Sequence, residues 1–240
     1  MGKRKNVRRT ALRGGWLVFV FLFGFLLAAF ASWQLLSGWR EDAAARNEYV
    51  TLRDEMERAQ FPDTHRMDMS PFMEQNPDFV GWIFVEGTPI SYPVVQGPDN
   101  AMYLHTTFLG QENPSGSIFM DYRAAQAFDT PLAILYGHNM RDGSMFASLH
   151  QFIYPEFSGN YPVITIINAD GERLIYQVFE VRWAEAQDAV YAVDPTDNLA
   201  TIAFFENAPD GASQFLVLST CAPPPNRTGR LLVLASYVPE

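Results

Sequence analysis

The sequence predicts a mostly β fold, a barrel or sandwich of about seven or eight strands with helical additions. Two observations carry this prediction. From Phe79 onward the chain consists of short runs rich in Val, Ile, Leu, Phe and Tyr, with turn residues between them. Before that point the composition favours helices, which we expect at residues 41–60 and 71–76.

The first 36 residues differ from the rest of the chain. Six Lys and Arg residues precede the uncharged apolar run Trp16–Leu36, and about 20 such residues can cross a bilayer as a helix. Cations ahead of a span indicate a cytoplasmic N-terminus. We therefore predict a basic cytoplasmic tail at 1–15, one transmembrane anchor at 16–36, and a cell-membrane protein whose remaining chain is extracellular. A cleaved signal peptide competes, since Ala29-Phe30-Ala31 resembles a cleavage site.

The predicted external part is strongly acidic. It holds 11 of the 17 basic residues and all 27 acidic residues, so its formal net charge is −16. An acidic surface repels phosphate backbones, so we expect no nucleic-acid partner. Its length of about 200 residues suits one domain with a sizeable core.

Residues 37–75 are predicted to form a helical extension. The segment from Glu41 to Gln60 is rich in helix formers, and Tyr49, Leu52 and Met56 recur in it at helical spacing. The sequence FPDTHRMDMSP then breaks the helix, and Pro71–Asn76 can form a second, short one.

The domain predicted at 76–240 contains the β-rich runs. Asp170-Gly171 lies between two apolar runs and is a strong hairpin signal. One helix is expected at DPTDNLATIAFFEN, residues 194–207, with Asp194 as its cap and Pro195 as its first residue. The apolar runs are 80–97, 116–122, 131–137, 161–186, 213–220 and 229–238.

Cys221 is the only cysteine in the chain, and it ends the apolar run FLVLSTC just before three prolines. A single cysteine excludes an intramolecular disulfide and a cysteine-ligated zinc site. Two interpretations remain, a buried small hydrophobe or a nucleophilic thiolate. No acidic cluster has the spacing of a calcium loop, so we expect neither metal nor cofactor.

A nucleophilic thiolate needs a base, and the chain offers four histidines. His138 follows the run LAILY and Gly137, so it lies at a strand-to-loop junction, as Cys221 does. Residues at strand ends on one rim of a barrel can converge in space. His65 falls in a polar linker, and His150 is more consistent with a helix after the loop; a turn histidine is the plainer interpretation of His138.

Acyl transfer at a cysteine also needs a donor to the oxyanion. Arg230 opens the next β run, so the returning strand can bring its guanidinium beside the sulfur. Arg227 is the rival in the same loop, and a surface arginine is the plainer interpretation of either residue.

These residues resemble a known family, the sortases, which are membrane-anchored cysteine transpeptidases of Gram-positive bacteria. LSTC at Leu218–Cys221 resembles their cysteine signature, YGHNM at Tyr136–Met140 resembles their histidine motif, and Arg230 stands where their arginine does. The stretches from Asn76 and from Gly116 look like the class B branch.

The resemblance implies a closed β-barrel of about eight strands with N-terminal helices and a helix before the cysteine strand. It implies Cys221 as nucleophile, His138 as general acid and base, and Arg230 as the oxyanion donor. The implied reaction cleaves a C-terminal sorting signal after Thr, on a surface protein or pilin, through a thioacyl-enzyme. An amine of a peptidoglycan precursor or a pilin then takes the acyl group.

Family members often carry an acidic residue soon after the cysteine, whereas this chain continues APPPNRTG. The resemblance therefore gives no carboxylate member of the site. Two alternatives stay open: an extracytoplasmic cysteine peptidase, and a non-catalytic anchored barrel that binds a wall component. The order His before Cys is the reverse of that in papain-like peptidases.

Overall fold

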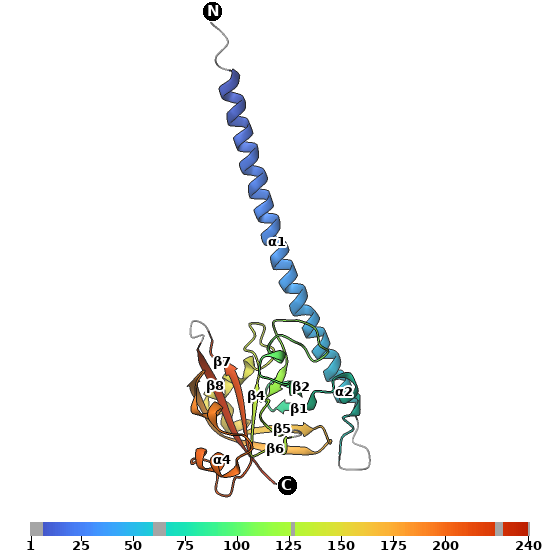
Figure 1. Ribbon diagram of the computed structural model, residues 1–240, viewed down its shortest axis with the longest axis vertical. Coiled ribbons are helices and arrows are strands. Elements are labelled where there is room, and N and C mark those ends of the chain that lie inside the picture. The colour runs from blue at the N-terminus through green and yellow to red at the C-terminus, as the bar shows by residue number, and fades with distance from the viewer. Residues whose placement is uncertain (1–6, 60–65, 126–127, 224–227, 240) are drawn as a thin grey trace, which may run out of the picture. The chain divides into compact units, whose positions relative to one another are not determined.

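The computed structural model describes residues 7–59, 66–125, 128–223 and 228–239. The chain divides into two compact units, Met1–Ala44 and Ala45–Glu240. One helix, α1 (Val7–Arg58), contributes residues to both (Figure 1). This helix covers most of the two segments that the sequence analysis separates as anchor and extension.

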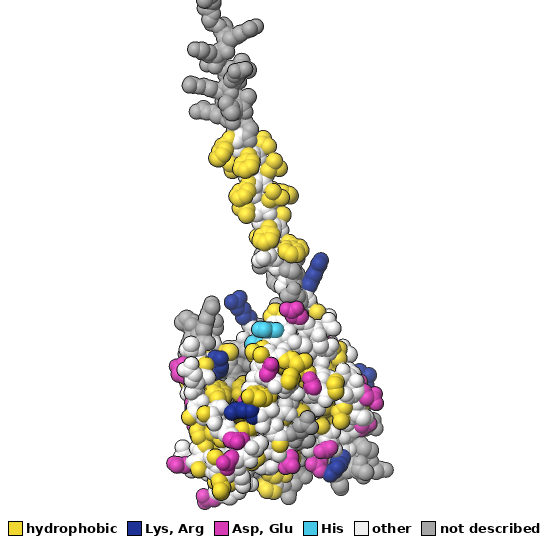
Figure 2. All heavy atoms as spheres, in the orientation of Figure 1, with side chains coloured by type: hydrophobic (Ala, Val, Ile, Leu, Met, Phe, Trp, Pro, Cys, Tyr) yellow, Lys and Arg dark blue, Asp and Glu magenta, His cyan; other side chains and the backbone are white. Residues whose placement is uncertain are grey.

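The described residues of the first unit form the N-terminal part of α1. Its large apolar side chains are exposed wherever they are described, from Trp16 at 67% to Trp33 at 64% (Figure 2). Among the described residues, no helix combines the length and the apolar character that crossing a membrane requires. The structure thus gives no support to the predicted anchor Trp16–Leu36, which stays a prediction.

Eight strands of the described chain close into a barrel in the order β1-β2-β3-β4-β7-β8-β6-β5 (Figure 1). The pairs β2–β3 and β4–β7 are parallel and the others are antiparallel. The predicted closed barrel of about eight strands is confirmed. The strands are β1 (Phe79–Val85), β2 (Ser91–Val95), β3 (Ile118–Met120), β4 (Leu132–Tyr136), β5 (Val163–Asn168), β6 (Arg173–Glu185), β7 (Phe215–Cys221) and β8 (Gly229–Tyr237).

The hairpin between β5 and β6 turns where the sequence predicts it. Ile167 pairs with Arg173 across the strands, and Gly171 in the turn has a φ of 77°. A side chain there would be strained and would also collide with the backbone, because a Cβ would lie 2.0 Å from the carbonyl oxygen of Met67.

Apolar side chains pack on both faces of the β4–β7–β8 sheet. Along β7, Leu216 and Leu218 belong to the large core inside the barrel, whereas Phe215 and Val217 belong to a second cluster. This alternation follows from the two-residue period of a strand. The second cluster, which we call the outer cluster, comprises Leu132, Ile134, Val190, Phe205, Phe215, Val217, Leu232 and Leu234.

The C-terminal part of α1 is built into the barrel unit. Tyr49, Leu52 and Met56, the residues predicted from helical spacing, are all buried in the main core. The Tyr49 hydroxyl donates to the carbonyl oxygen of Gly116 at 2.6 Å. The short helix α2 (Ser70–Gln75) follows near its predicted position and buries Phe72.

The connection from β6 to β7 contains the predicted helix, with one correction. It holds a 3₁₀ turn, η4 (Ala189–Ala192), and then α4 (Asn198–Phe204). The helix begins later than expected, because Asp197 and not Asp194 accepts the capping hydrogen bond, from the backbone of Ala200. Asp194 instead accepts hydrogen bonds from Thr196 in the preceding turn. Further helices of the described chain are η1 (Met102–Leu104), η3 (Ala147–Ile153) and α3 (Pro155–Asn160).

Candidate active site

Cys221 is the last residue of β7, and its side chain is half-buried. Strand alternation puts Cys221 and Ser219 on the same face as Val217, the face of the outer cluster. The thiol therefore lies outside the barrel core. The interpretation of Cys221 as a fully buried hydrophobe does not agree with this exposure.

Arg230 is the second residue of β8 and the direct cross-strand partner of Cys221. Facing residues in an antiparallel pair project their side chains to the same side of the sheet. β8 also pairs with β6, where Ala184 faces Arg230. The guanidinium Nη1 donates to the carbonyl oxygen of Gly229 at 3.0 Å.

His138 comes two residues after β4, at the strand-to-loop junction that the sequence predicts. Because β4 and β7 are parallel neighbours, their C-terminal ends lie at the same end of the barrel. The Thr220 hydroxyl donates to the carbonyl oxygen of Gly137 at 2.8 Å, and the Asn139 amide donates to that of Cys221 at 3.1 Å. These bonds fix the histidine loop against the cysteine strand.

The ring of His138 also makes a hydrogen bond of its own. Nε2 lies 2.8 Å from the carbonyl oxygen of Leu104, and a carbonyl can only accept, so Nε2 carries the proton in this arrangement. Nδ1 is then the nitrogen that can act as a base. The ring of His105 stacks on that of His138 with a centroid distance of 5.9 Å.

The three predicted site residues line one pocket of about 300 Å³. His138 comes from the loop after β4, Cys221 from β7 and Arg230 from β8. Aromatic and apolar side chains form part of the wall and polar groups form the rest, which is the usual make-up of a ligand site. The other lining residues are Asn100, Leu104, Phe119, Tyr136, Gly137, Ala186, Tyr191, Ser219 and Thr220.

Tyr191 and Ser219 are pocket residues that the sequence analysis missed. Their hydroxyls form a hydrogen bond of 2.8 Å, which joins η4 to the cysteine strand. Burial raises the pKa of Tyr191, and the Ser219 hydrogen bond and the Arg230 charge offset that rise only in part. Tyr191 is therefore a neutral hydroxyl at physiological pH. Ser219 could have been found from its place two residues before Cys221, but no local pattern indicates Tyr191.

The rival site residues have different outcomes. His65 and Arg227 lie outside the described residues. His150 is on η3, as expected for a helix, where its Nδ1 bonds the carbonyl oxygen of Ala147 at 2.9 Å and its ring lies beside Trp183. It does not line the pocket. Within the described ranges, no group of three or more His, Cys, Asp or Glu side chains gathers to hold a metal ion.

A closed barrel with a cysteine, a histidine and an arginine around one pocket defines the class of protein, a β-barrel cysteine enzyme. The sequence model of the sortase domain matches residues 83–238. The chain therefore belongs to the sortase family.

The chain is most similar to class B sortases. It is 36% identical to sortase B of Listeria monocytogenes over 127 residues, 53% of this chain and 46% of that protein. It is 29% identical to sortase B of Staphylococcus aureus over 182 residues, 74% of this chain and 70% of that protein. The matches thus span about half and about two thirds of these relatives. A solved complex of Staphylococcus aureus sortase B with substrate superposes with a TM-score of 0.69 at 26% identity, covering 83% of this chain and 98% of the other.

Proposed function

We propose that this chain is a sortase-type transpeptidase that cleaves a C-terminal sorting signal after Thr and transfers the acyl group to an amine. One observation carries the proposal: Cys221, His138 and Arg230 line the same pocket. Family membership supports it, because the motifs that hold the three residues resemble the family's cysteine, histidine and arginine motifs.

In the first half-reaction, Cys221 acts as the nucleophile. Its proton passes to His138, and Sγ forms a bond to the carbonyl carbon of the substrate Thr. The C–N bond of the peptide then breaks, and the leaving nitrogen takes the proton from His138. The products are a thioester on Cys221 and a free C-terminal fragment.

In the second half-reaction, an amine replaces the leaving fragment. Its nitrogen attacks the thioester carbon, the C–S bond breaks, and the proton lost by the amine returns to the sulfur through His138. A new amide bond forms, and the free thiol is restored. Water in place of the amine would give hydrolysis, which is the reaction of the alternative cysteine peptidase.

Arg230 is the donor to the substrate carbonyl oxygen. In each half-reaction that oxygen gains negative charge, and a fixed cation beside it lowers the barrier. The cross-strand pairing of Cys221 with Arg230 supports this role, since it holds the guanidinium on the side of the sheet to which the sulfur points.

The proposed partners are surface proteins or pilins that carry a sorting signal, and a peptidoglycan precursor or pilin that supplies the amine. The solved complex of Staphylococcus aureus sortase B with substrate supports a substrate that binds directly to the enzyme. Transfer to the wall needs the enzyme at the cell surface, which agrees with the predicted anchor at Trp16–Leu36 and a cytoplasmic N-terminus.

One assay tests the reaction. The barrel unit, residues 45–240, is mixed with a panel of LPxTG-like and NPxTx-like peptides, with and without an amine nucleophile. A transpeptidase gives an amine-linked product that Cys221→Ala abolishes. Hydrolysis that added amine does not divert would favour the peptidase alternative, and no turnover of any peptide would favour the non-catalytic barrel.

The anchor is tested separately by the mass of the protein extracted from membranes of cells that express the full chain. An intact N-terminus supports a retained anchor. A mature N-terminus at Ser32 would support the signal-peptide alternative, and recovery of the full-length chain in the soluble fraction would contradict both.

A further inference from the structure

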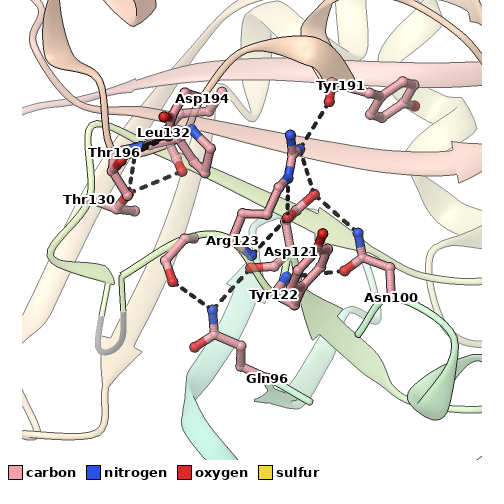
Figure 3. Close-up of polar contacts among 12 residues, drawn as sticks. Gln96, Asn100, Asp121, Tyr122, Arg123, Thr130, Leu132, Tyr191, Asp194 and Thr196 are labelled. Carbon is pink, nitrogen blue, oxygen red and sulfur yellow. Dashed lines mark hydrogen bonds and ion pairs between the residues drawn. The ribbon is translucent and has the colours of Figure 1, made fainter. Parts of the chain in front are cut away.

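Asp121 is a buried carboxylate directly after β3, and only 1% of it is exposed. Both of its oxygens are occupied. Oδ1 accepts from the backbone N–H and from Nε of Arg123, at 3.0 and 2.9 Å. Oδ2 accepts from Nη2 of Arg123 at 3.0 Å and from the Asn100 amide at 3.2 Å (Figure 3). Oδ2 also accepts from the Tyr136 hydroxyl at 3.0 Å.

The partners of Asp121 form part of the candidate active site. Asn100 and Tyr136 line the pocket. Nη2 of Arg123 also donates to the carbonyl oxygen of Tyr191 at 2.9 Å, and Tyr191 is a third lining residue. Figure 3 shows Arg123 between Asp121 and this carbonyl. Together these residues, Asn100, Asp121, Arg123, Tyr136 and Tyr191, are called the Asp121 network.

The Asp121 network connects three separate segments of the chain to the Asp121 carboxylate, directly or through Arg123. Asn100 comes from the loop before η1, Tyr136 from the end of β4, and Tyr191 from η4 in the β6–β7 connection. The ring of Tyr191 also stacks on that of Tyr136, at a centroid distance of 6.1 Å. Besides the hydrogen bond of its hydroxyl to Ser219, Tyr191 is therefore held through its ring and its backbone carbonyl, and both of these contacts lead to Asp121.

The charge of Asp121 is essential to this arrangement. Burial alone would raise the pKa of Asp121, but the hydrogen bonds from Arg123 and Tyr136 lower it overall, so the carboxylate is ionised. A two-oxygen acceptor matches the planar fork of an arginine. An asparagine would present an NH₂ group to one of these donors and could not satisfy all of them.

We propose that Asp121 and Arg123 are positioning residues that fix the pocket walls at Asn100, Tyr136 and Tyr191 for binding of the peptide substrate. They act through these walls and do not touch the reacting atoms. The expected effect on peptide kinetics rests on the proposed function. The effect on the position of η4 can be measured without any substrate.

The test compares Asp121→Asn, Arg123→Gln and Arg123→Lys with Glu172→Gln in the otherwise unchanged chain. Glu172 pairs with Arg66 on the exposed surface, at residues that do not line the pocket, so its variant controls for loss of an ion pair. Arg123→Gln keeps the proposal testable if Asp121→Asn does not fold, because it leaves the carboxylate its Tyr136, Asn100 and backbone donors.

Two readouts separate positioning from general stability. Hydrogen exchange of the peptide covering residues 186–197 reports on η4 without a substrate. The kinetics of peptide turnover report on the pocket. The rate of Cys221 alkylation by iodoacetamide is the reference for the reactivity of the thiol itself. We expect faster exchange in this segment for Arg123→Gln, and a fall in kcat/KM of about tenfold or more that lies mainly in KM. Alkylation should change by less than about twofold, because the small reagent needs no pocket wall.

Partial recovery in Arg123→Lys supports the proposal, since lysine keeps the charge and loses the fork. Unchanged exchange of residues 186–197 in Arg123→Gln, or equal effects in Glu172→Gln, would overturn it. If the unaltered chain turns over no peptide, the proposed function fails, and the exchange result still decides whether the Asp121 network holds η4.

Discussion

Cys221 and Arg230 face each other across the antiparallel pair β7–β8. Their side chains share the outer face of the sheet, while His138 reaches the same pocket from the loop after β4, the other neighbour of β7. β7 therefore places the thiol between the two strands that supply its partners. The positions of all three residues depend on the register of neighbouring strands, which a well-packed sheet holds rigidly.

His138→Ala should lower kcat by a factor on the order of 10² to 10⁴, because general acid–base catalysis is lost at both half-reactions. His150→Ala is the matched control, as His150 does not line the pocket. A severe loss in His150→Ala with near-normal rates in His138→Ala would show that the base is misassigned.

Arg230→Ala should lower kcat about a hundredfold with a smaller effect on KM, because the guanidinium acts on charge that develops in the transition state. Arg230→Lys should recover only part of the rate. Arg173→Ala is the control, since Arg173 also opens a strand, β6, and lies away from the pocket. Steady-state kinetics that placed the large loss in Arg227→Ala instead would move the oxyanion role to Arg227.

Thr220→Val should lower the free energy of unfolding by about 1 kcal/mol, because it removes the hydroxyl that donates to Gly137 and leaves a carbonyl without this donor. Thr201→Val is the matched control, because it makes the same substitution at another buried threonine. Thr201 is buried, and its hydroxyl has no hydrogen-bond partner in the described structure, so this substitution should be neutral or stabilising. Urea denaturation measures both, and equal losses would contradict a specific role for the Thr220 contact.

Asp121→Asn should destabilise the protein in a pH-dependent way. The folded state lowers the pKa of Asp121, so its contribution is complete above the unfolded pKa of about 3.9 and is lost as the pH falls through the folded value. The difference in unfolding free energy between the two proteins should therefore be largest near neutral pH and shrink below about pH 4. Urea denaturation at several pH values tests this, and a difference that grew on acidification would have the wrong sign.

Much of the barrel could be predicted from local sequence. Apolar runs with turn residues between them mark the strands, and Asp170-Gly171 marks the β5–β6 turn because that geometry favours glycine. The strand-end positions of His138 and Cys221 followed from the same runs. Their convergence at one pocket depends on the parallel β4–β7 pair, which the sequence pattern alone does not reveal.

The parts that escaped prediction depend on contacts between distant segments. Tyr191 reaches the pocket because of the path of the β6–β7 connection and its contact with Arg123, 68 residues away in the chain. Asp194 and Asp197 are both suitable caps, and tertiary packing decides where α4 begins. The position of Tyr191 and the first residue of α4 depend on tertiary contacts, so no local sequence pattern predicts them.

The most direct test of the central claim is the intact mass of the protein after brief mixing with a sorting-signal peptide that is cleaved after Thr. We predict a mass increase equal to the acyl fragment, located on Cys221 by peptide mapping. The adduct should be absent in Cys221→Ala and should disappear when an amine is added, with a matching amount of amine-linked product. Turnover that persists in Cys221→Ala, or an adduct on another residue, would contradict the assignment of Cys221 as the nucleophile.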